Sequence, residues 1–125
     1  MNRPPAQRFE DLIVWQKSHA LTLRVYRTTR SFPKEELFGL SAQMRRAAVS
    51  VPANIAEGFS RRGRADKARY LNTAQASLEE LRYYFILALD LSYLEDQQWH
   101  DLDEGARMLG AYSRTVRTSA SAPSS

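Results

Sequence analysis

Apolar residues recur at steps of three and four positions through most of the chain, which is the period of amphipathic α-helices. Short links, such as Ser31-Phe32-Pro33 and the stretch from Gly58 to Gly63, separate these runs. The pattern predicts helices over residues 8–30, 35–60, 65–94 and 97–117. Because short links join antiparallel neighbours, the expected fold is all-α, an antiparallel up-down-up-down four-helix bundle.

The two ends of the chain differ from the predicted helices in composition. Residues 1–7 are polar and contain two prolines, and residues 118–125 are small and polar. Such segments have little apolar surface to bury. We therefore expect a flexible N-terminus over 1–7, one bundle domain over 8–117 and a disordered tail over 118–125.

The predicted second helix carries a polar row beside an apolar one. The apolar row, which is typical of a core-facing seam, comprises Leu40, Met44, Ala47, Val51, Ile55 and Phe59. The polar row consists of Gln43, Arg46, Ser50, Asn54 and Glu57. Buried polar groups without partners cost about 1–3 kcal/mol each, so this row is expected to face another polar surface or a ligand.

A hairpin closed near Gly63 would place Glu79 opposite Arg46. We interpret these two residues as a buried ion pair. Asn54 and Glu57 are interpreted as part of an interhelical polar network. Networks of this kind fix the register of two helices more than they add stability.

Pro52 lies inside the predicted second helix, where it removes one backbone hydrogen bond and crowds the carbonyl four residues earlier. A bend near Ala48–Val51 is expected. The bend either wraps the helix around its core or exposes carbonyls at a functional surface.

The predicted first and third helices carry apolar residues on two sides. In the first, one face holds Leu12, His19, Leu23 and Tyr26, and the nearly opposite face holds Val14, Leu21 and Val25. In the third, the seam of Leu71, Leu78, Phe85 and Leu89 has Tyr84, Leu87 and Leu91 on its other side. A helix that is apolar all round is buried all round, which predicts a homo-oligomer; scattered exposed apolar residues are the alternative.

Five ordered blocks of the chain resemble a known family. They are Phe9-Glu-Asp-Leu-Ile-Val-Trp-Gln-Lys17, Phe32-Pro-Lys-Glu-Glu-Leu-Phe-Gly-Leu40, Gln43-Met-Arg-Arg46, Asn54-Ile-Ala-Glu-Gly58 and Ser77-Leu-Glu-Glu-Leu81. The family is that of small bacterial four-helix-bundle proteins encoded by intervening sequences in 23S ribosomal RNA genes. It is similar to the accessory proteins of diversity-generating retroelements, which form basic homopentameric barrels and bind a reverse transcriptase and nucleic acid. The resemblance thus implies a homopentamer; from about Trp99 onward no block matches.

The charge of the chain is basic, with 18 lysines and arginines against 14 acidic residues and a net charge of +4. The isoelectric point of about 9.7 is in the range that suggests nucleic-acid binding. There is no cysteine, and no apolar run approaches the ~20 residues of a membrane span. A cytoplasmic protein without membrane contact is expected.

The basic excess is local. It is concentrated in Arg61, Arg62, Arg64, Lys67 and Arg69, which we call the turn cluster. Guanidinium groups bind phosphates, so this link between helices is the candidate nucleic-acid site, and Arg45 is expected to extend it. Lys17, Arg24 and Arg27 form a lesser stripe on the first helix. The alternative is a solvated turn, since no aromatic residue is interleaved to stack bases.

Motifs of enzyme chemistry are lacking in the sequence. Nucleophile elbows, phosphate loops and cofactor fingerprints are absent, and the spacing of His100 and Glu104 is more typical of a solvated helix start than of a metal site. No cofactor and no metal are therefore predicted. The expected function is a non-catalytic oligomeric scaffold that binds RNA or DNA, with a reverse transcriptase or ribosomal component as possible partner. The alternatives are a protein-binding adaptor and, more distantly, a hydrolase with Glu57 or Glu79 as base.

Overall fold

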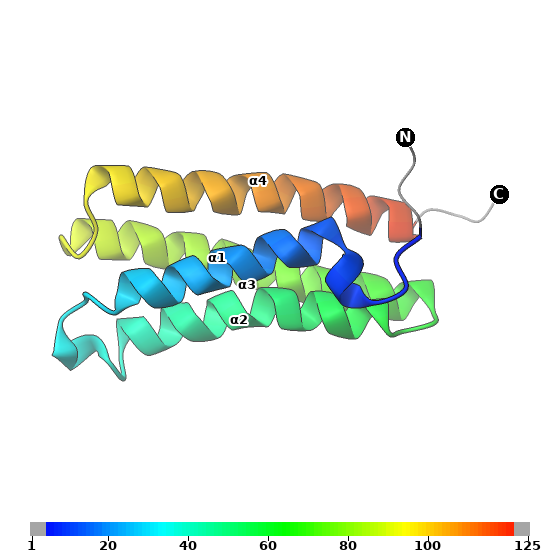
Figure 1. The fold of residues 1–125 in the computed structure, drawn as a ribbon, viewed down its shortest axis with the longest axis horizontal. Coiled ribbons are helices and arrows are strands. Elements are labelled where there is room, and N and C mark those ends of the chain that lie inside the picture. Colours follow the sequence, from blue (N-terminus) through cyan, green and yellow to red (C-terminus); the bar gives the residue numbers. More distant parts are fainter. Residues whose placement is uncertain (1–4, 122–125) are drawn as a thin grey trace.

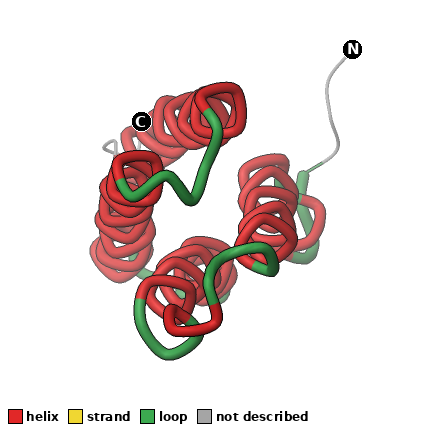
Figure 2. Tube along the Cα trace, turned by 90° about the vertical axis from the view of Figure 1, so that its left-hand side faces the viewer, coloured by secondary structure: helices red, strands yellow, loops and turns green. Residues whose placement is uncertain are grey.

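The computed structural model describes the backbone of residues 5–121 and the side chains of residues 5–113. Over these residues the elements are η1 (Phe9–Asp11), α1 (Ile13–Thr29), η2 (Lys34–Glu36), α2 (Leu40–Phe59), α3 (Arg64–Asp90) and α4 (Asp96–Ser121), where η denotes a short 3-10 helix. Successive α-helices run in opposite directions (Figure 1) and follow one another around the core (Figure 2). The predicted all-α four-helix bundle is confirmed.

The helix boundaries differ from the predicted ones at several ends. The expected helices 8–30 and 35–60 each begin with a separate 3-10 turn, so that α1 starts at Ile13 and α2 at Leu40. α4 continues to Ser121, beyond the predicted end at 117 and into the segment expected to be a tail. Residues 1–4 and 122–125, which fall in the predicted flexible ends, lie outside the described residues.

α3 ends at Asp90 rather than at 94 because the chain turns sharply there. Ser92 takes a φ of 64°, and the amides of Ser92 and Tyr93 donate to the carbonyls of Leu89 and Ala88 at 2.9 and 2.8 Å. These bonds end the helix in a motif whose left-handed residue, here Ser92, is usually a glycine. Because a serine stands where a glycine is usual, the sequence did not indicate that the helix ends here.

The core lies on the bundle axis and is closely packed. Its most deeply buried large side chains, each at most 2% exposed, are Met44, Ile55, Leu78, Leu81, Phe85 and Leu109. The predicted seam of the second helix is confirmed from Leu40 to Ile55, with Phe59 half-buried at its end. Among the described helices, none is both long and apolar enough to cross a membrane.

The two apolar faces of α1 are reversed relative to the sequence-based assignment. Val14, Leu21 and Val25 belong to the monomer core, at 2%, 5% and 0% exposure, whereas Leu23 and Tyr26 are 44% and 38% exposed. On α3, Leu71, Leu78 and Phe85 are buried as predicted, and Leu89 is half-buried. Tyr84 and Leu87 pack partly buried against the core of the monomer, and Leu91, which directly follows α3, is exposed.

Small hydroxyl residues explain the reversal. Ser18, Thr22 and Thr29 are buried on the same side of α1 as the core residues. Their hydroxyls donate to carbonyls of the same helix, with Thr22 bonding to Ser18 and Thr29 bonding to Val25, both at 2.8 Å. Because such hydroxyls are satisfied locally, they can be buried at little cost, and a count of apolar residues alone favours the wrong face.

Pro52 leaves the Ala48 carbonyl without its helical donor, and α1 supplies a replacement. The Thr22 hydroxyl, which is buried, lies 3.0 Å from the Ala48 oxygen and 2.8 Å from the Ser18 oxygen, so its one proton is shared between the two carbonyls. Pro52 itself is also buried. The freed carbonyl therefore faces the neighbouring helix, as the packing interpretation of this proline expects, and not a functional surface.

We predict that Thr22→Val destabilises the fold by about 1–3 kcal/mol, because the Ala48 carbonyl would remain buried without a donor. The cost should shrink in a Pro52→Ala background, where the amide of residue 52 can donate to that carbonyl again. Chemical denaturation of the four proteins in this cycle measures both values. Equal costs in the two backgrounds would show that proline and threonine act independently.

The start of α2 depends on a close contact with η2. The Glu36 carboxylate accepts hydrogen bonds from the Leu40 amide at 3.0 Å and from the Tyr93 hydroxyl at 2.9 Å. These bonds, the amide first, lower the pKa of Glu36 below its usual value, so the group is ionised at neutral pH. Gly39 permits the contact, since a Cβ there would lie 2.7 Å from the same carboxylate.

Candidate nucleic-acid interface

The turn cluster lies where α2 ends and α3 begins, at one end of the bundle (Figure 1). Gly63 precedes the first residue of α3, and a Cβ at Gly63 would meet no atom within 4 Å. The five basic residues are close in sequence. Their side chains nevertheless have different environments, which separate cations that shape the turn from cations that face solvent.

Arg61 fixes the turn. Its Nη2 donates to the Glu57 carboxylate at 3.0 Å and to the Tyr70 hydroxyl at 2.9 Å, and the guanidinium lies 4.9 Å from the centre of the Tyr70 ring. The charge interaction with Tyr70, followed by the bonds to Glu57, raises the pKa of Arg61. Arg61 therefore joins the end of α2 to the first turns of α3, and its donors are partly used before any ligand arrives.

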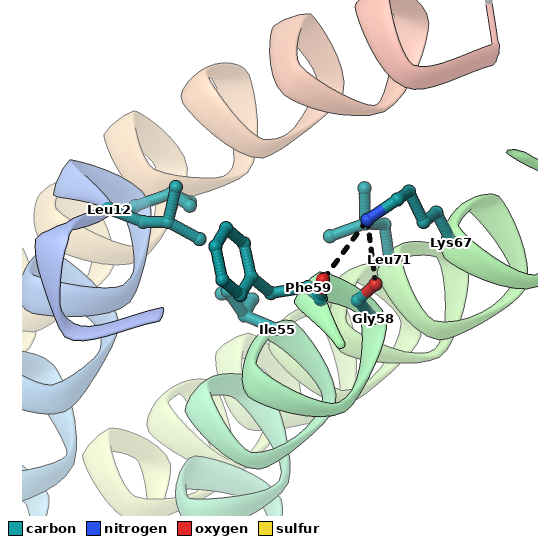
Figure 3. A pocket seen from close by; sticks show the side chains of 7 residues that line it. Leu12, Ile55, Gly58, Phe59, Lys67 and Leu71 are labelled. Carbon is teal, nitrogen blue, oxygen red and sulfur yellow. Dashed lines mark hydrogen bonds between the residues drawn. The ribbon is translucent and has the colours of Figure 1, made fainter. Parts of the chain in front are cut away.

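Lys67 caps the end of α2. Its ammonium group donates to the carbonyls of Phe59 at 3.1 Å and Gly58 at 3.4 Å (Figure 3), and the Gly58 carbonyl also accepts from the Arg61 amide at 3.2 Å. The ammonium also lies 5.7 Å from the centre of the Phe59 ring. A cation at this position is favoured by the negative end of the helix dipole. Lys67 thus has a structural role in this turn.

Arg69 is paired but exposed. Its guanidinium lies 3.2 Å from the Asp66 carboxylate, and the two side chains are 67% and 55% exposed. The guanidinium is also 5.1 Å from the centre of the Tyr70 ring, on which Arg61 packs as well. Tyr70 is therefore an aromatic residue within the turn cluster, contacted by two of its five cations.

Arg62 and Arg64 are two further members of the turn cluster that face solvent. Both are exposed, and among the described residues Arg62 has neither a hydrogen bond nor an ion pair. The Arg62 side chain can therefore rearrange around a phosphate without breaking the turn. Both arginines are residues of the predicted site that the geometry leaves accessible.

Arg45 does not extend the turn cluster. It lies one turn into α2, toward the opposite end of the bundle (Figure 1). Its Nε donates to the Thr29 hydroxyl at 2.9 Å, and its guanidinium lies 4.9 Å from the centre of the Tyr26 ring. The expectation of one continuous patch is wrong because α2 has 20 residues and is about 30 Å long.

The predicted buried ion pair between Arg46 and Glu79 is also wrong. Both residues are exposed, and the Glu79 carboxylate instead pairs with Arg82, one turn along α3, at 3.5 Å. The hairpin register does bring Arg46 near α3, where its charge acts on Tyr84. The polar row of α2 is thus solvated at this point.

Asn54 and Glu57 belong to two separate sets of contacts. The Asn54 amide donates to the carbonyl and hydroxyl of Ser50 at 2.8 and 3.0 Å, and the Ser50 hydroxyl lies 2.7 Å from that of Ser77 on α3. This chain of bonds connects α2 to α3. Glu57 is not part of it, since its carboxylate pairs with Arg61.

The hydrolase alternative gains no support from these environments. The Glu57 and Glu79 side chains are 55% and 54% exposed, and each lies against an arginine. A general base is normally activated in a desolvated site with a substrate position beside it. The pocket near Glu57, shown in Figure 3, is small and apolar, lined by residues such as Leu12, Ile55 and Leu71.

A shallow groove between α1 and α4 contains part of the lesser basic stripe. Lys17 and Arg24 line an open depression of about 270 Å³ together with Met108 and Tyr112 of α4. Arg24 also borders an acidic part of α4 that contains Glu104. The stripe therefore lies beside carboxylates, which reduces its attraction for phosphate.

Two features were not found by sequence reasoning. One is the buried Asp103, whose carboxylate oxygens lie 3.1 Å from Arg82 and 3.0 Å from Arg107. The four-residue spacing of Asp103 and Arg107 was a readable signal, but the contact with Arg82 depends on how α3 and α4 pack. The other is Phe38, which is 92% exposed near the start of α2.

The fold and the exposed basic turn define the class: a small helical-bundle protein with a solvated cationic link at one end. The chain belongs to the family of 23S rRNA-intervening sequence proteins, whose family model matches residues 10–113. A solved structure from Bacteroides thetaiotaomicron, described as a protein of unknown function from the S23 ribosomal protein family, has the same fold. It is 23% identical, covers 84% of this chain and 98% of its own, and has a TM-score of 0.76. None of the curated proteins compared with this chain matches it.

Proposed function

We propose that this protein is a non-catalytic, homo-oligomeric scaffold that binds the phosphate backbone of nucleic acid through Arg62 and Arg64. The observation that carries the proposal is that some cations of the turn cluster hold the turn while others face solvent. Arg61 and Lys67 hold the turn through bonds to Glu57, Tyr70 and the end of α2. Exposed guanidinium groups are thereby presented on a fixed support, which favours backbone contacts over base-specific ones.

We propose RNA rather than DNA as the ligand. The family takes its name from 23S rRNA, and the structural relative is described as an S23 ribosomal family protein. Backbone contacts through arginine do not themselves distinguish the two polymers. A cytoplasmic location, and a ribosomal component or a reverse transcriptase as partner, belong to the same proposal.

Self-association is supported by exposed apolar residues on two separate helices. Leu23 and Tyr26 form an exposed pair on α1, and Tyr83 and Ile86 form another on α3. These helices lie diagonally across the bundle and are not neighbours in it (Figure 2). Two different faces on opposite sides suit head-to-tail contacts, which close into rings, better than a two-fold dimer. A pentameric ring would repeat the basic turn by symmetry and sum its field.

Salt dependence tests the nucleic-acid function. Affinity for mixed-sequence duplex RNA should fall by about 0.9 log unit per log unit of salt for each phosphate neutralised. Arg62→Gln with Arg64→Gln should flatten that slope by up to about 1.8, and should change thermal stability little because exposed turn charges contribute little to folding. Fluorescence anisotropy across a salt series measures the slope.

The matched control is Lys17→Gln with Arg24→Gln, which removes the same charge from α1. It should leave the slope close to that of the unmodified protein. If this control weakens binding and the turn variant does not, α1 is the binding face. If the unmodified protein binds no RNA at low salt, the adaptor alternative, supported by the same exposed apolar residues, takes precedence.

A further inference from the structure

We infer that the end of the bundle opposite the turn cluster holds a second nucleic-acid contact, a pocket for one phosphate with a stacking surface beside it. The inference rests on the proposed function and adds a site that is physically separate from the turn. The pocket lies between the end of α1, η2 and the start of α2. Its volume is about 420 Å³, and its lining residues are Thr29, Arg30, Phe32, Pro33, Lys34, Leu37, Ser41 and Arg45. We call it the η2 pocket.

The charge of the η2 pocket is uniformly positive. Arg30, Lys34 and Arg45 line it, and no carboxylate does. Two acids adjoin the lining residues along the chain. Glu36 accepts hydrogen bonds from the Leu40 amide and the Tyr93 hydroxyl. Glu35 is exposed and does not line the pocket. Three cations without an internal counter-charge favour an anion with more than one oxygen, which is the chemistry of a phosphate group.

Arg45 is already oriented for such a ligand. Only its Nε is used, in the bond to the Thr29 hydroxyl, while the Tyr26 ring supports the guanidinium plane. A guanidinium carries five N–H donors, so the Nη atoms keep their donors for a ligand. Holding the group in place beforehand lowers the entropy cost of binding.

Ser41 gives an independent sign that the η2 pocket binds a polar group. It is 2% exposed and lines the pocket, yet its hydroxyl has no hydrogen-bond partner among the described residues. Its oxygen is not one of the fully buried side-chain atoms without a partner, so it opens onto the pocket, where it can donate to a ligand. Ser41 lies in the first turn of α2, next to Leu40, whose amide already donates to the Glu36 carboxylate. A phosphate oxygen would satisfy the hydroxyl.

Phe38 is not a lining residue of the η2 pocket, but it adjoins one along the chain and is free to stack a base. It is 92% exposed, and it directly follows Leu37, which lines the pocket. An exposed ring beside a phosphate site can stack a base, and stacking tolerates any sequence. This pairing of cation and aromatic residue is what favours a single-stranded nucleic acid over a free phosphate ion or a protein.

The test uses a labelled tetranucleotide of RNA, because it is too short to connect the two ends of the bundle. When stacked it spans roughly 14 Å, against about 30 Å for α2. Ser41→Ala should weaken its binding about tenfold through loss of a bond to a charged group. Phe38→Ala should weaken it at least about fivefold through loss of stacking. Arg30→Gln with Lys34→Gln should weaken it as well, and fluorescence anisotropy on the full-length protein measures all three.

The controls separate this site from the turn cluster. Lys17→Gln with Arg24→Gln should leave tetranucleotide binding unchanged. Arg62→Gln with Arg64→Gln removes the turn as a second binding site, and in that background Ser41→Ala and Phe38→Ala should still weaken the remaining tetranucleotide binding. Ser41→Ala removes an unpaired hydroxyl and should keep the thermal stability, so loss of binding would not reflect unfolding. If inorganic phosphate displaces the tetranucleotide and binds with the same affinity, the η2 pocket is a site for free anions. That result would overturn its assignment to a nucleic-acid strand.

Three outcomes would overturn the inference, and they show whether the η2 pocket alone or also the proposed function is wrong. Tetranucleotide binding that is unaffected by Ser41→Ala and Phe38→Ala, with duplex binding still sensitive to Arg62 and Arg64, removes only the η2 pocket. A change of assembly state in Phe38→Ala with unaltered RNA affinity would identify a protein interface instead. Absence of binding to RNA of any length removes both proposals.

Discussion

Leu21→Asp should abolish the folded state, whereas Leu23→Asp should leave the monomer folded. The two leucines are two positions apart on α1, and their exposures are 5% and 44%. A carboxylate at position 21 would have to enter the core without a partner, in addition to the loss of leucine packing. The combined cost exceeds about 4 kcal/mol, a large part of the 5–15 kcal/mol that stabilises an ordinary domain.

Circular dichroism and thermal melting distinguish the two variants. Leu23→Asp should retain helical signal and a cooperative transition, because its side chain can stay in water. If the exposed face of α1 is an interface between copies, light scattering should also show a smaller particle for Leu23→Asp. A folded, cooperative Leu21→Asp protein would contradict the assignment of this face to the core.

Most of the fold could be predicted from the period of apolar residues, and the failures have local physical causes. The α2 seam from Leu40 to Ile55 was readable because its members are large, apolar and regularly spaced. α1 was not, because Thr22 and Ser18 are buried with their hydroxyls bonded to their own helix. Ser92, which ends α3 in a left-handed conformation, carries no residue-type signal for that role.

The candidate site could be predicted only as a region. The sequence shows that basic residues are concentrated between Arg61 and Arg69. It does not show which of them are already bonded to other groups of the protein. Whether a cation already has a partner depends on Tyr70, which is nine residues beyond Arg61, and on the carbonyls at the end of α2. The predicted pair of Arg46 and Glu79 failed for a related reason: a partner one turn away, Arg82, is closer than one across the hairpin.

Asp103, and not the predicted pair of Arg46 and Glu79, is the buried ionic group among the described residues, and the second large effect is expected there. Its side chain is 9% exposed and lies between Arg82 and Arg107, which are 31% and 53% exposed. Replacing both arginines with methionine should destabilise the fold by about 3 kcal/mol, because a buried carboxylate would lose both partners. We place the value at the low end of the usual range since both arginines are partly solvated.

A third substitution identifies the source of that cost. Adding Asp103→Leu to the two methionine changes should recover much of the lost stability, since an apolar group then replaces the stranded charge. Arg69→Met is the matched control: its pair with Asp66 is exposed on both sides, so its loss should cost less than about 1 kcal/mol. Urea denaturation at neutral pH measures all of these variants. If Asp103→Leu instead added a further loss, the stabilising element would be the arginine stems packed on α3 and α4, and not the charge they neutralise.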